Sequence, residues 1–282
     1  MSVPSTARPG ARLRLAALLG PPMVWLVVAY LGSMAVLLVS AFWSTNTFTG
    51  AVVPVYTSGN LLALVTDPLY RDVTLRTLLV ALGVTVLDAA VAVPMALYMS
   101  RVASPRARVA LVVAVTTPLW ASYLVKAYAW RVLLSPTGPI AWLTGGHSSG
   151  YGIGAVVVTL AYLWLPYMVL PVFAGFDRVP DSLLEASADL GAPMRTTLRR
   201  IVAPLVLPAV AAGSIFTFSL SLGDYIAVTI VGGKTQMLGN VIYGQLITAN
   251  DQPLAAALSL VPLAAIVIYL LAMRRTGALE NV

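Results

Sequence analysis

The stretch EASADLGAPMRTTLRRIVAP, residues 185–204, carries five charged side chains in twenty residues, whereas only 10% of the whole chain is charged. It lies between two long apolar runs. Polar side chains at this density avoid the hydrocarbon of a membrane. The stretch therefore indicates a structured segment outside the bilayer, within a chain that otherwise suits its interior.

The composition of the chain is that of an integral membrane protein. Of its 282 residues 59% are hydrophobic, and the mean hydropathy is +0.90, far above the apolar share of an ordinary soluble domain. The chain has no cysteine and one histidine, which excludes disulfides, thiolate metal sites and a histidine metal cluster.

Six apolar runs are long enough to cross about 30 Å of hydrocarbon, at about residues 23–42, 73–99, 109–133, 153–176, 205–231 and 254–273. The uncharged stretch 15–42 is too long for a signal-peptide core of about 7–15 residues, so the first helix is predicted to be retained. We expect an all-α membrane protein with six transmembrane helices. The predicted division is a variable tail at 1–20, a six-helix domain at 21–275 and a C-terminal tail at 276–282.

The basic residues predict the orientation. Twelve of the seventeen lysines and arginines fall on one side of the predicted helices, and the positive-inside rule makes that side cytoplasmic. Both termini and the stretch 185–204 are then cytoplasmic. No basic stripe interleaves with aromatic residues, so nucleic acid is not an expected partner. The twelve residues are Arg8, Arg12, Arg14, Arg101, Arg106, Arg108, Arg178, Arg195, Arg199, Arg200, Arg274 and Arg275.

The polar stretch is predicted to form two short helices. VPDSLLEASADL has Pro180 at its start, Asp181 as an N-cap and an apolar stripe. Gly191 ends this helix, and Pro193 suits the first turn of the second. Such a pair of helices is either a docking element or a solvated loop between membrane helices.

The spacing within this stretch resembles the EAA loop of ABC-importer permeases, which reads E-A-A, three residues, G, nine residues, I-x-L-P. The chain keeps the spacing and departs from the motif twice, with Ser187 for the second alanine and Ala203 for the leucine. We refer to residues 177–204 as the motif loop. The matching and contacting residues that the resemblance implies are Glu185, Ala186, Ser187, Asp189, Gly191, Ile201 and Pro204.

The resemblance implies that the motif loop is the coupling helix that inserts into a groove on a cytoplasmic ATPase. The small residues beside Glu185 would let helices approach closely, and Glu185 or Asp189 would pair with basic groups of the ATPase. Gly191 would permit a turn that a side chain obstructs. The docked loop would transmit closure of the ATPase to a permease with inward-open and outward-open states.

A wider resemblance, over about residues 60–275, is to permeases of the spermidine/putrescine type. It rests on DPLY (67–70), ASYLVKAYAWRVLLSPTGPI (121–140) and SLGDYIAVTIVGG (221–233), and on the order of the elements. It implies a type I ABC-importer architecture in the bacterial inner membrane and transport of a polyamine. Family members also carry opines and other organic cations. The implied partners are a second permease subunit in a heterodimer, a dimeric ATPase, an extracytoplasmic solute-binding protein and lipid.

Nothing in the sequence predicts catalysis or a cofactor on this chain. GGKT (232–235) resembles the end of a phosphate-binding loop, but Val228 stands where its first glycine must be. The resemblance implies that ATP and Mg²⁺ are bound by the ATPase subunit. A secondary transporter is the alternative from another class, and the sequence shows no inverted repeat in its favour.

Charged and aromatic residues within the predicted spans are the remaining candidates for function. Asp88 and Asp224 would each cost about 2.5–3.5 kcal/mol at the centre of a bilayer. Either they form structural ion pairs with Lys126 and Arg131, or they line the solute path. Asp224 is the stronger path candidate because polar residues surround it.

Aromatic faces attract ammonium groups, which makes Tyr225, Tyr128 and Trp130 further candidates for the path. Tyr128 and Trp130 suit an interfacial aromatic belt equally well. The outward loops at 44–72 and 135–152 are where a solute-binding protein would land, and 60–65 is predicted to form a short helix on the membrane surface.

Overall fold

The computed structural model describes residues 9–274 except Thr47 and Ser149, with side chains from residue 17 onward. The predicted tail at 1–20 lies partly outside these residues and the predicted tail at 276–282 entirely. Within the described part, five helices are long and apolar enough to cross a membrane, and a bent pair would make a sixth. The predicted all-α architecture with up to six membrane-spanning helices is confirmed.

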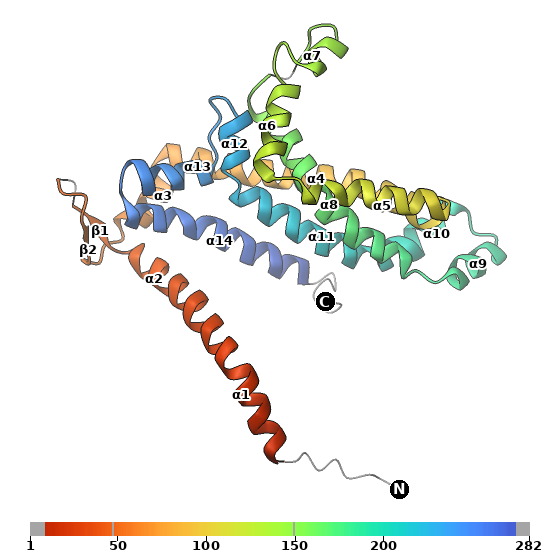
Figure 1. The fold of residues 1–282 in the computed structure, drawn as a ribbon, viewed down its shortest axis with the longest axis horizontal. Helices are drawn as coiled ribbons and strands as arrows, with labels where there is room; N and C mark the ends of the chain where they lie inside the picture. Colours follow the sequence, from red (N-terminus) through yellow and green to blue (C-terminus); the bar gives the residue numbers. More distant parts are fainter. Residues whose placement is uncertain (1–8, 47, 149, 275–282) are drawn as a thin grey trace.

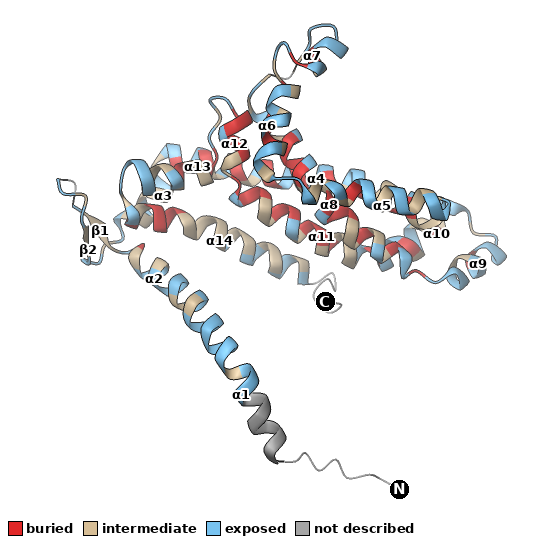
Figure 2. Ribbon diagram, in the orientation of Figure 1, coloured by how far each residue is buried: buried red, intermediate tan, exposed pale blue. Residues whose placement is uncertain are grey.

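Three long helices form the centre of the molecule: α4 (Pro68–Arg101), α8 (Ile153–Asp177) and α11 (Ala203–Gly223). They run side by side, and most buried residues lie on them (Figures 1 and 2). Helix α14 (Gln252–Arg274) packs against α11, and α5 (Pro105–Trp120) packs against α8. The spans predicted at 153–176 and 254–273 are α8 and α14, with ends within two residues.

Glycines allow α8 and α11 to approach closely. A Cβ on Gly175 would lie 2.5 Å from the Cβ of Ala209, and a Cβ on Gly213 would lie 2.8 Å from Sδ of Met168. Membrane helices associate largely through such close packing, because lipid is as apolar as a leucine side chain. The two helices are therefore held in one register by shape.

The first helical segment stands apart from the centre. It consists of α1 (Pro9–Leu26), a π-helical turn η1 (Val27–Leu31) and α2 (Gly32–Ser40). None of residues 17–40 is buried (Figure 2). Only the end of α2 packs against the rest of the protein, where Leu37 contacts a cluster that contains Ala257. The helix begins before the predicted span at 23–42 and includes part of the predicted tail.

The span predicted at 109–133 is bent rather than straight. Helix α5 ends at Trp120, and α6 (Tyr123–Leu133) leaves it at 102°. One turn after Pro118 the backbone leaves the helical conformation: Ala121 is extended, with a ψ of 143°, and Ser122 has a ψ of 136°. Helix α6 packs against α12 (Ile226–Val231) and leads to α7 (Pro139–Leu143), which projects from the bundle (Figure 1).

The span predicted at 205–231 is displaced toward the N-terminus. Its helix runs from Met194 to Gly223 through α10 (Met194–Thr197), a π-helical turn η2 (Leu198–Val202) and α11. The chain then breaks at Asp224 before α12 begins. A wide turn just before Pro204 accommodates a residue that has no N–H to donate.

Small elements gather at the end opposite the motif loop. Strands β1 (Ser44–Thr45) and β2 (Val52–Val53) pair antiparallel, with Thr45 opposite Val52. Helix α3 (Gly59–Thr66) confirms the short helix predicted at 60–65. Helix α13 (Leu238–Tyr243) and the π-helical turn η3 (Gly244–Thr248) precede α14. We call this the hairpin end; Figure 1 shows it across the bundle from α9 (Asp181–Asp189).

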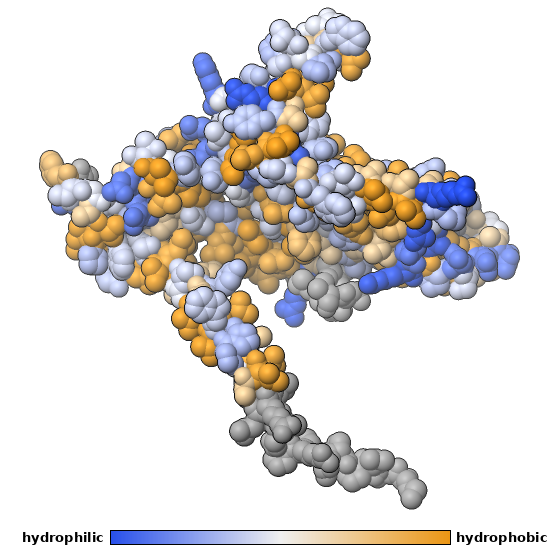
Figure 3. All heavy atoms as spheres, in the orientation of Figure 1, coloured by the Kyte–Doolittle hydropathy of each residue, from blue (hydrophilic) through white to orange (hydrophobic). Residues whose placement is uncertain are grey.

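The hydropathy of the surface also differs between the long bundle and the end that carries the motif loop. Hydrophobic residues cover much of the long bundle, while strongly hydrophilic residues gather at the end that carries α9 and α10 (Figure 3). This distribution suits a bundle surrounded by lipid with the motif loop outside it.

Candidate functional site

The motif loop has the predicted form of two short helices around a glycine. Helix α9 ends in a Schellman motif: Ala192 N donates to Ser187 O at 3.0 Å, and Gly191 N donates to Ala188 O at 2.8 Å. Gly191 has a φ of +68°, a conformation that residues with a Cβ rarely adopt. The glycine is thus required by the backbone rather than by lack of space, since a Cβ at this position would meet nothing within 4 Å.

Two details of these helices differ from the prediction. Asp181 is the first residue of α9 and not its N-cap, because Pro180 holds that place without a side-chain hydrogen bond. Pro193 is the residue before α10 rather than part of its first turn.

Ser187 faces inward and joins the two helices. Its Oγ lies 2.7 Å from Oγ1 of Thr197, and both residues are buried. Neighbouring Glu185, Ala186 and Asp189 are all exposed. The serine that replaces the motif's second alanine therefore adds a hydrogen bond inside the loop, while the acidic residues remain accessible to solvent.

The tip of the motif loop presents two apolar residues that the sequence did not single out. Leu190 is 87% exposed and Met194 is 72% exposed, on either side of Gly191. In the sequence Leu190 continues the apolar stripe of α9, so the pattern does not indicate that Leu190 is exposed. An apolar centre with a polar rim is the arrangement found in protein–protein interfaces, and Leu190 and Met194 between exposed polar residues have that arrangement.

The remaining motif residues lie where the loop enters the bundle. Ile201 is half-buried within η2, and Pro204 is exposed in the first turn of α11. The second half of the motif loop therefore continues without a break through η2 into α11.

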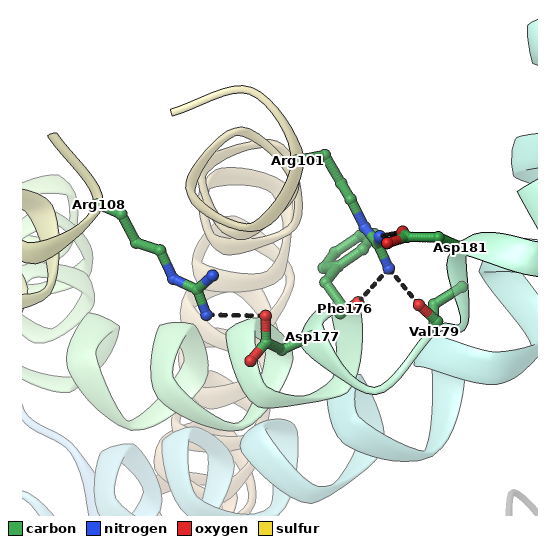
Figure 4. A network of polar contacts seen from close by, with 6 residues as sticks. All are labelled: Arg101, Arg108, Phe176, Asp177, Val179 and Asp181. Atoms are coloured by element: carbon green, nitrogen blue, oxygen red, sulfur yellow. Dashed lines mark hydrogen bonds and ion pairs between the residues drawn. The ribbon is translucent and has the colours of Figure 1, made fainter. Parts of the chain in front are cut away.

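Two arginines hold the loop side of the bundle together (Figure 4). Arg101, at the end of α4, pairs with Asp181 and donates to the carbonyl oxygens of Phe176, at 2.8 Å, and Val179. Arg108 of α5 pairs with Asp177 at 2.7 Å. The end of α8 and the start of α9 are thereby tied to α4 and α5.

A second candidate site surrounds Asp224, in the break between α11 and α12. The Tyr123 hydroxyl donates to Asp224 Oδ2, and the Ala227 N–H donates to Asp224 Oδ1 at 2.9 Å. Asp224 is 8% exposed and lines a cavity of about 330 Å³ with Tyr123, Trp164 and Tyr225. The site therefore combines a carboxylate with three aromatic side chains.

A neighbouring cavity of about 460 Å³ shares Tyr225 with the first. Tyr128, Asn240 and Tyr243 also line it, and the rings of Tyr225 and Tyr243 stack with centroids 5.1 Å apart. The structure thus brings together three of the path candidates, Asp224, Tyr225 and Tyr128, along one surface.

The other two path candidates lie elsewhere. Trp130 packs on the core, with its ring 5.4 Å from that of Tyr162, and lines neither cavity. Asp88 shares one face of α4 with Val84 and Ala92, one turn away on each side, and all three are at most 1% exposed. Its Oδ2 has no hydrogen-bond partner among the described residues.

The predicted alternative of structural ion pairs within the membrane is not seen. In the described part of the chain, the ion pairs are those of Arg101 and Arg108, so neither Asp88 nor Asp224 pairs with a base there. Arg131 instead donates to Ile230 O at 3.1 Å and lies over the ring of Tyr151. The sequence could not reveal that Asp224 meets Tyr123, 101 positions away.

Known proteins resemble this chain along most of its length. The family model of binding-protein-dependent transport system inner membrane components matches residues 59–276. The inner membrane ABC transporter permease protein YdcU of Escherichia coli (strain K12) is 43% identical, over 96% of this chain and 92% of that protein. The spermidine/putrescine transport system permease protein PotB of the same organism is 31% identical, over 76% of this chain and 81% of that protein.

Solved structures show the same fold at lower identity. A chain of a bacterial ABC transporter involved in the import of the acidic polysaccharide alginate matches with a TM-score of 0.72 at 17% identity, covering 94% of this chain and 96% of that one. A chain of the MetNI methionine ABC transporter, in an inward-facing conformation, matches with a TM-score of 0.58 at 17% identity, covering 78% of this chain and 96% of that one.

Proposed function

Since the chain belongs to the family of binding-protein-dependent transport system inner membrane components, we propose that this ABC-importer permease subunit carries an organic cation of the polyamine type past Asp224. Transport by a multi-pass subunit of the inner membrane is the activity of the family. The solute, its path and the partner subunits are the proposal.

The observation that carries the proposal is the cavity at Asp224. A polyammonium solute needs a carboxylate to balance its charge, and aromatic faces attract ammonium groups by about 0.5–2 kcal/mol each. Asp224 supplies the carboxylate, and Tyr123, Trp164 and Tyr225 line the same cavity. Tyr128 and Tyr243 extend the aromatic lining into the neighbouring cavity. The similarity to PotB, a spermidine/putrescine permease by name, supports the same solute class.

The hydrogen bonds of Asp224 suit a passage rather than a tight site. Tyr123 and the Ala227 N–H each donate to one of its oxygens, so the carboxylate is stabilised without a permanently bound base. An ammonium group could approach from the cavity and leave again, as transport requires. A fixed arginine at this place would repel the solute.

The proposed assembly follows from the two ends of the molecule. The motif loop would dock on a dimeric ATPase that binds ATP and Mg²⁺, with Leu190 and Met194 in apolar contact and Glu185 and Asp189 facing basic groups. In this arrangement both termini would lie in the cytoplasm. A second permease subunit would complete the path, and a solute-binding protein would deliver solute at the hairpin end, over the loops 44–72 and 135–152.

Uptake by the complete importer tests the solute class. Membrane vesicles that contain all subunits should accumulate labelled spermidine or putrescine only when ATP is supplied. Unlabelled putrescine should compete, whereas butane-1,4-diol, which has the same carbon chain but no charge, should not. Equal competition by the diol, or no competition by either compound, would contradict a site that recognises ammonium groups.

A further inference from the structure

The three central helices differ in how they connect to the motif loop. Helix α8 ends at Asp177, a few residues before α9, and α10 continues through η2 into α11. Helix α4 has no such continuity, since Arg101 and Asp181 are 80 positions apart in sequence. A displacement of the motif loop therefore reaches α8 and α11 through the backbone but reaches α4 through side chains.

Arg101 makes polar contacts that join α4 to the loop. One guanidinium nitrogen pairs with Asp181 at the start of α9, and another donates to Phe176 O and Val179 O at the end of α8 (Figure 4). The arginine side chain is 23% exposed, whereas that of Asp181 is 78% exposed. A planar guanidinium holds several acceptors in a fixed geometry, which a lysine cannot do.

Apolar contacts at the same place lack this directionality. Met99, near the end of α4, is fully buried in a cluster with Phe176 and Val179, and Leu184 of α9 packs against that cluster. Apolar burial is non-directional, so this packing depends less on the orientation of the two segments than the polar contacts beside it do. Hydrogen bonds weaken steeply with misalignment. The polar contacts of Arg101 therefore set the register between α4 and the loop.

We propose that Arg101 is a positioning residue that makes α4 move together with the motif loop during the transport cycle. The inference rests on the proposed docking of the loop on an ATPase. Helix α4 carries Asp88 and packs along both α8 and α11. A loop that moved α8 and α11 but left α4 behind would shear the three-helix core instead of opening it.

The first test compares spermidine uptake per ATP hydrolysed in proteoliposomes that contain the complete importer. Arg101→Ala removes several charge-assisted hydrogen bonds and should lower this ratio about tenfold, with ATP hydrolysis within about twofold of the unaltered importer. Arg101→Lys keeps the charge but lacks the planar guanidinium, so it should restore the ratio only in part. Arg106→Ala, an exposed arginine of α5, is the matched control and should change nothing. Equal ratios for Arg101→Ala and Arg106→Ala would overturn the proposal.

The second test measures movement and does not depend on the solute. The chain has no cysteine, so cysteines introduced at Val102 and Ser182, both exposed, place one spin label at the end of α4 and one on α9. The distance between the labels should stay the same through the ATP cycle, and with Arg101→Ala it should shift and broaden when ATP is added. A change of distance in the unaltered importer, or none with Arg101→Ala, would contradict coupled movement even if the solute were not a polyamine.

Discussion

Ser187 Oγ and Thr197 Oγ1 lie 2.7 Å apart, and their hydrogen bond is buried between α9 and α10. The motif that this loop resembles has an alanine at the position of Ser187. Here the loop is stiffened by an interaction between two hydroxyl groups ten positions apart. Stiffness matters for a segment that must pass a displacement from one protein to another without absorbing it.

Removal of either hydroxyl should destabilise the loop, and removal of both should restore part of the loss. Ser187→Ala leaves a buried Thr197 hydroxyl without its partner, which costs about 1–3 kcal/mol, and Thr197→Val does the converse. Thermal unfolding of the purified importer should show a lower midpoint for each single variant and a less than additive effect in the double variant. Strict additivity would show that the two hydroxyls do not interact.

The effect of a substitution at Gly191 on uptake should depend on how well the new residue tolerates a positive φ. Gly191→Val places a β-branched side chain at a φ of +68°, which costs on the order of 1–3 kcal/mol. The loop should then lose its turn, so that uptake falls while the chain remains inserted. Gly191→Asn should be nearly neutral because asparagine also ends helices in this conformation. Equal uptake by the two variants at matched expression would contradict a role for this turn.

The exposed tip of the motif loop should hold the ATPase. Leu190→Ser removes an apolar side chain that is 87% exposed, so the fold of the permease should be unaffected. Loss of such an anchor from an interface costs about 1–2 kcal/mol or more, and the ATPase should dissociate roughly tenfold more readily during purification. Leu190→Met keeps the apolar contact and serves as the control. Unchanged retention of the ATPase by Leu190→Ser would place the contact elsewhere.

The sequence predicted the features that depend on local patterns. Apolar runs located α8 and α14 to within two residues, and Pro180, Gly191 and Pro193 predicted a loop of two short helices. Gly191 was identified as the turn, although the reason is its positive φ and not the obstruction by a side chain that was expected. Each of these features depends on residues that are close together in the sequence.

Features that depend on distant contacts could not be predicted. Ala121 and Ser122 belong to an apolar run, and nothing in that run reveals that α6 turns away to pack on α12. The hydrogen bond of Asp224 to Tyr123 joins two segments far apart in sequence, so an ion pair with Lys126 or Arg131 was an equally reasonable prediction. The hydrogen bond of Ser187 to Thr197 likewise joins residues ten positions apart, across the turn.

Spermidine uptake by the importer with Asp224→Asn, measured together with thermal stability and ATP hydrolysis, tests the proposed solute path most directly. Asparagine keeps the shape and can still accept a hydrogen bond, but it removes the charge that an ammonium group requires. The unaltered importer at matched expression is the reference. We expect Asp224→Asn to lower uptake about tenfold or more, as when a charge-assisted contact of about 1.5–3 kcal/mol is lost, with stability and basal ATP hydrolysis unchanged. Uptake equal to that of the unaltered importer would contradict a path for the cation past Asp224.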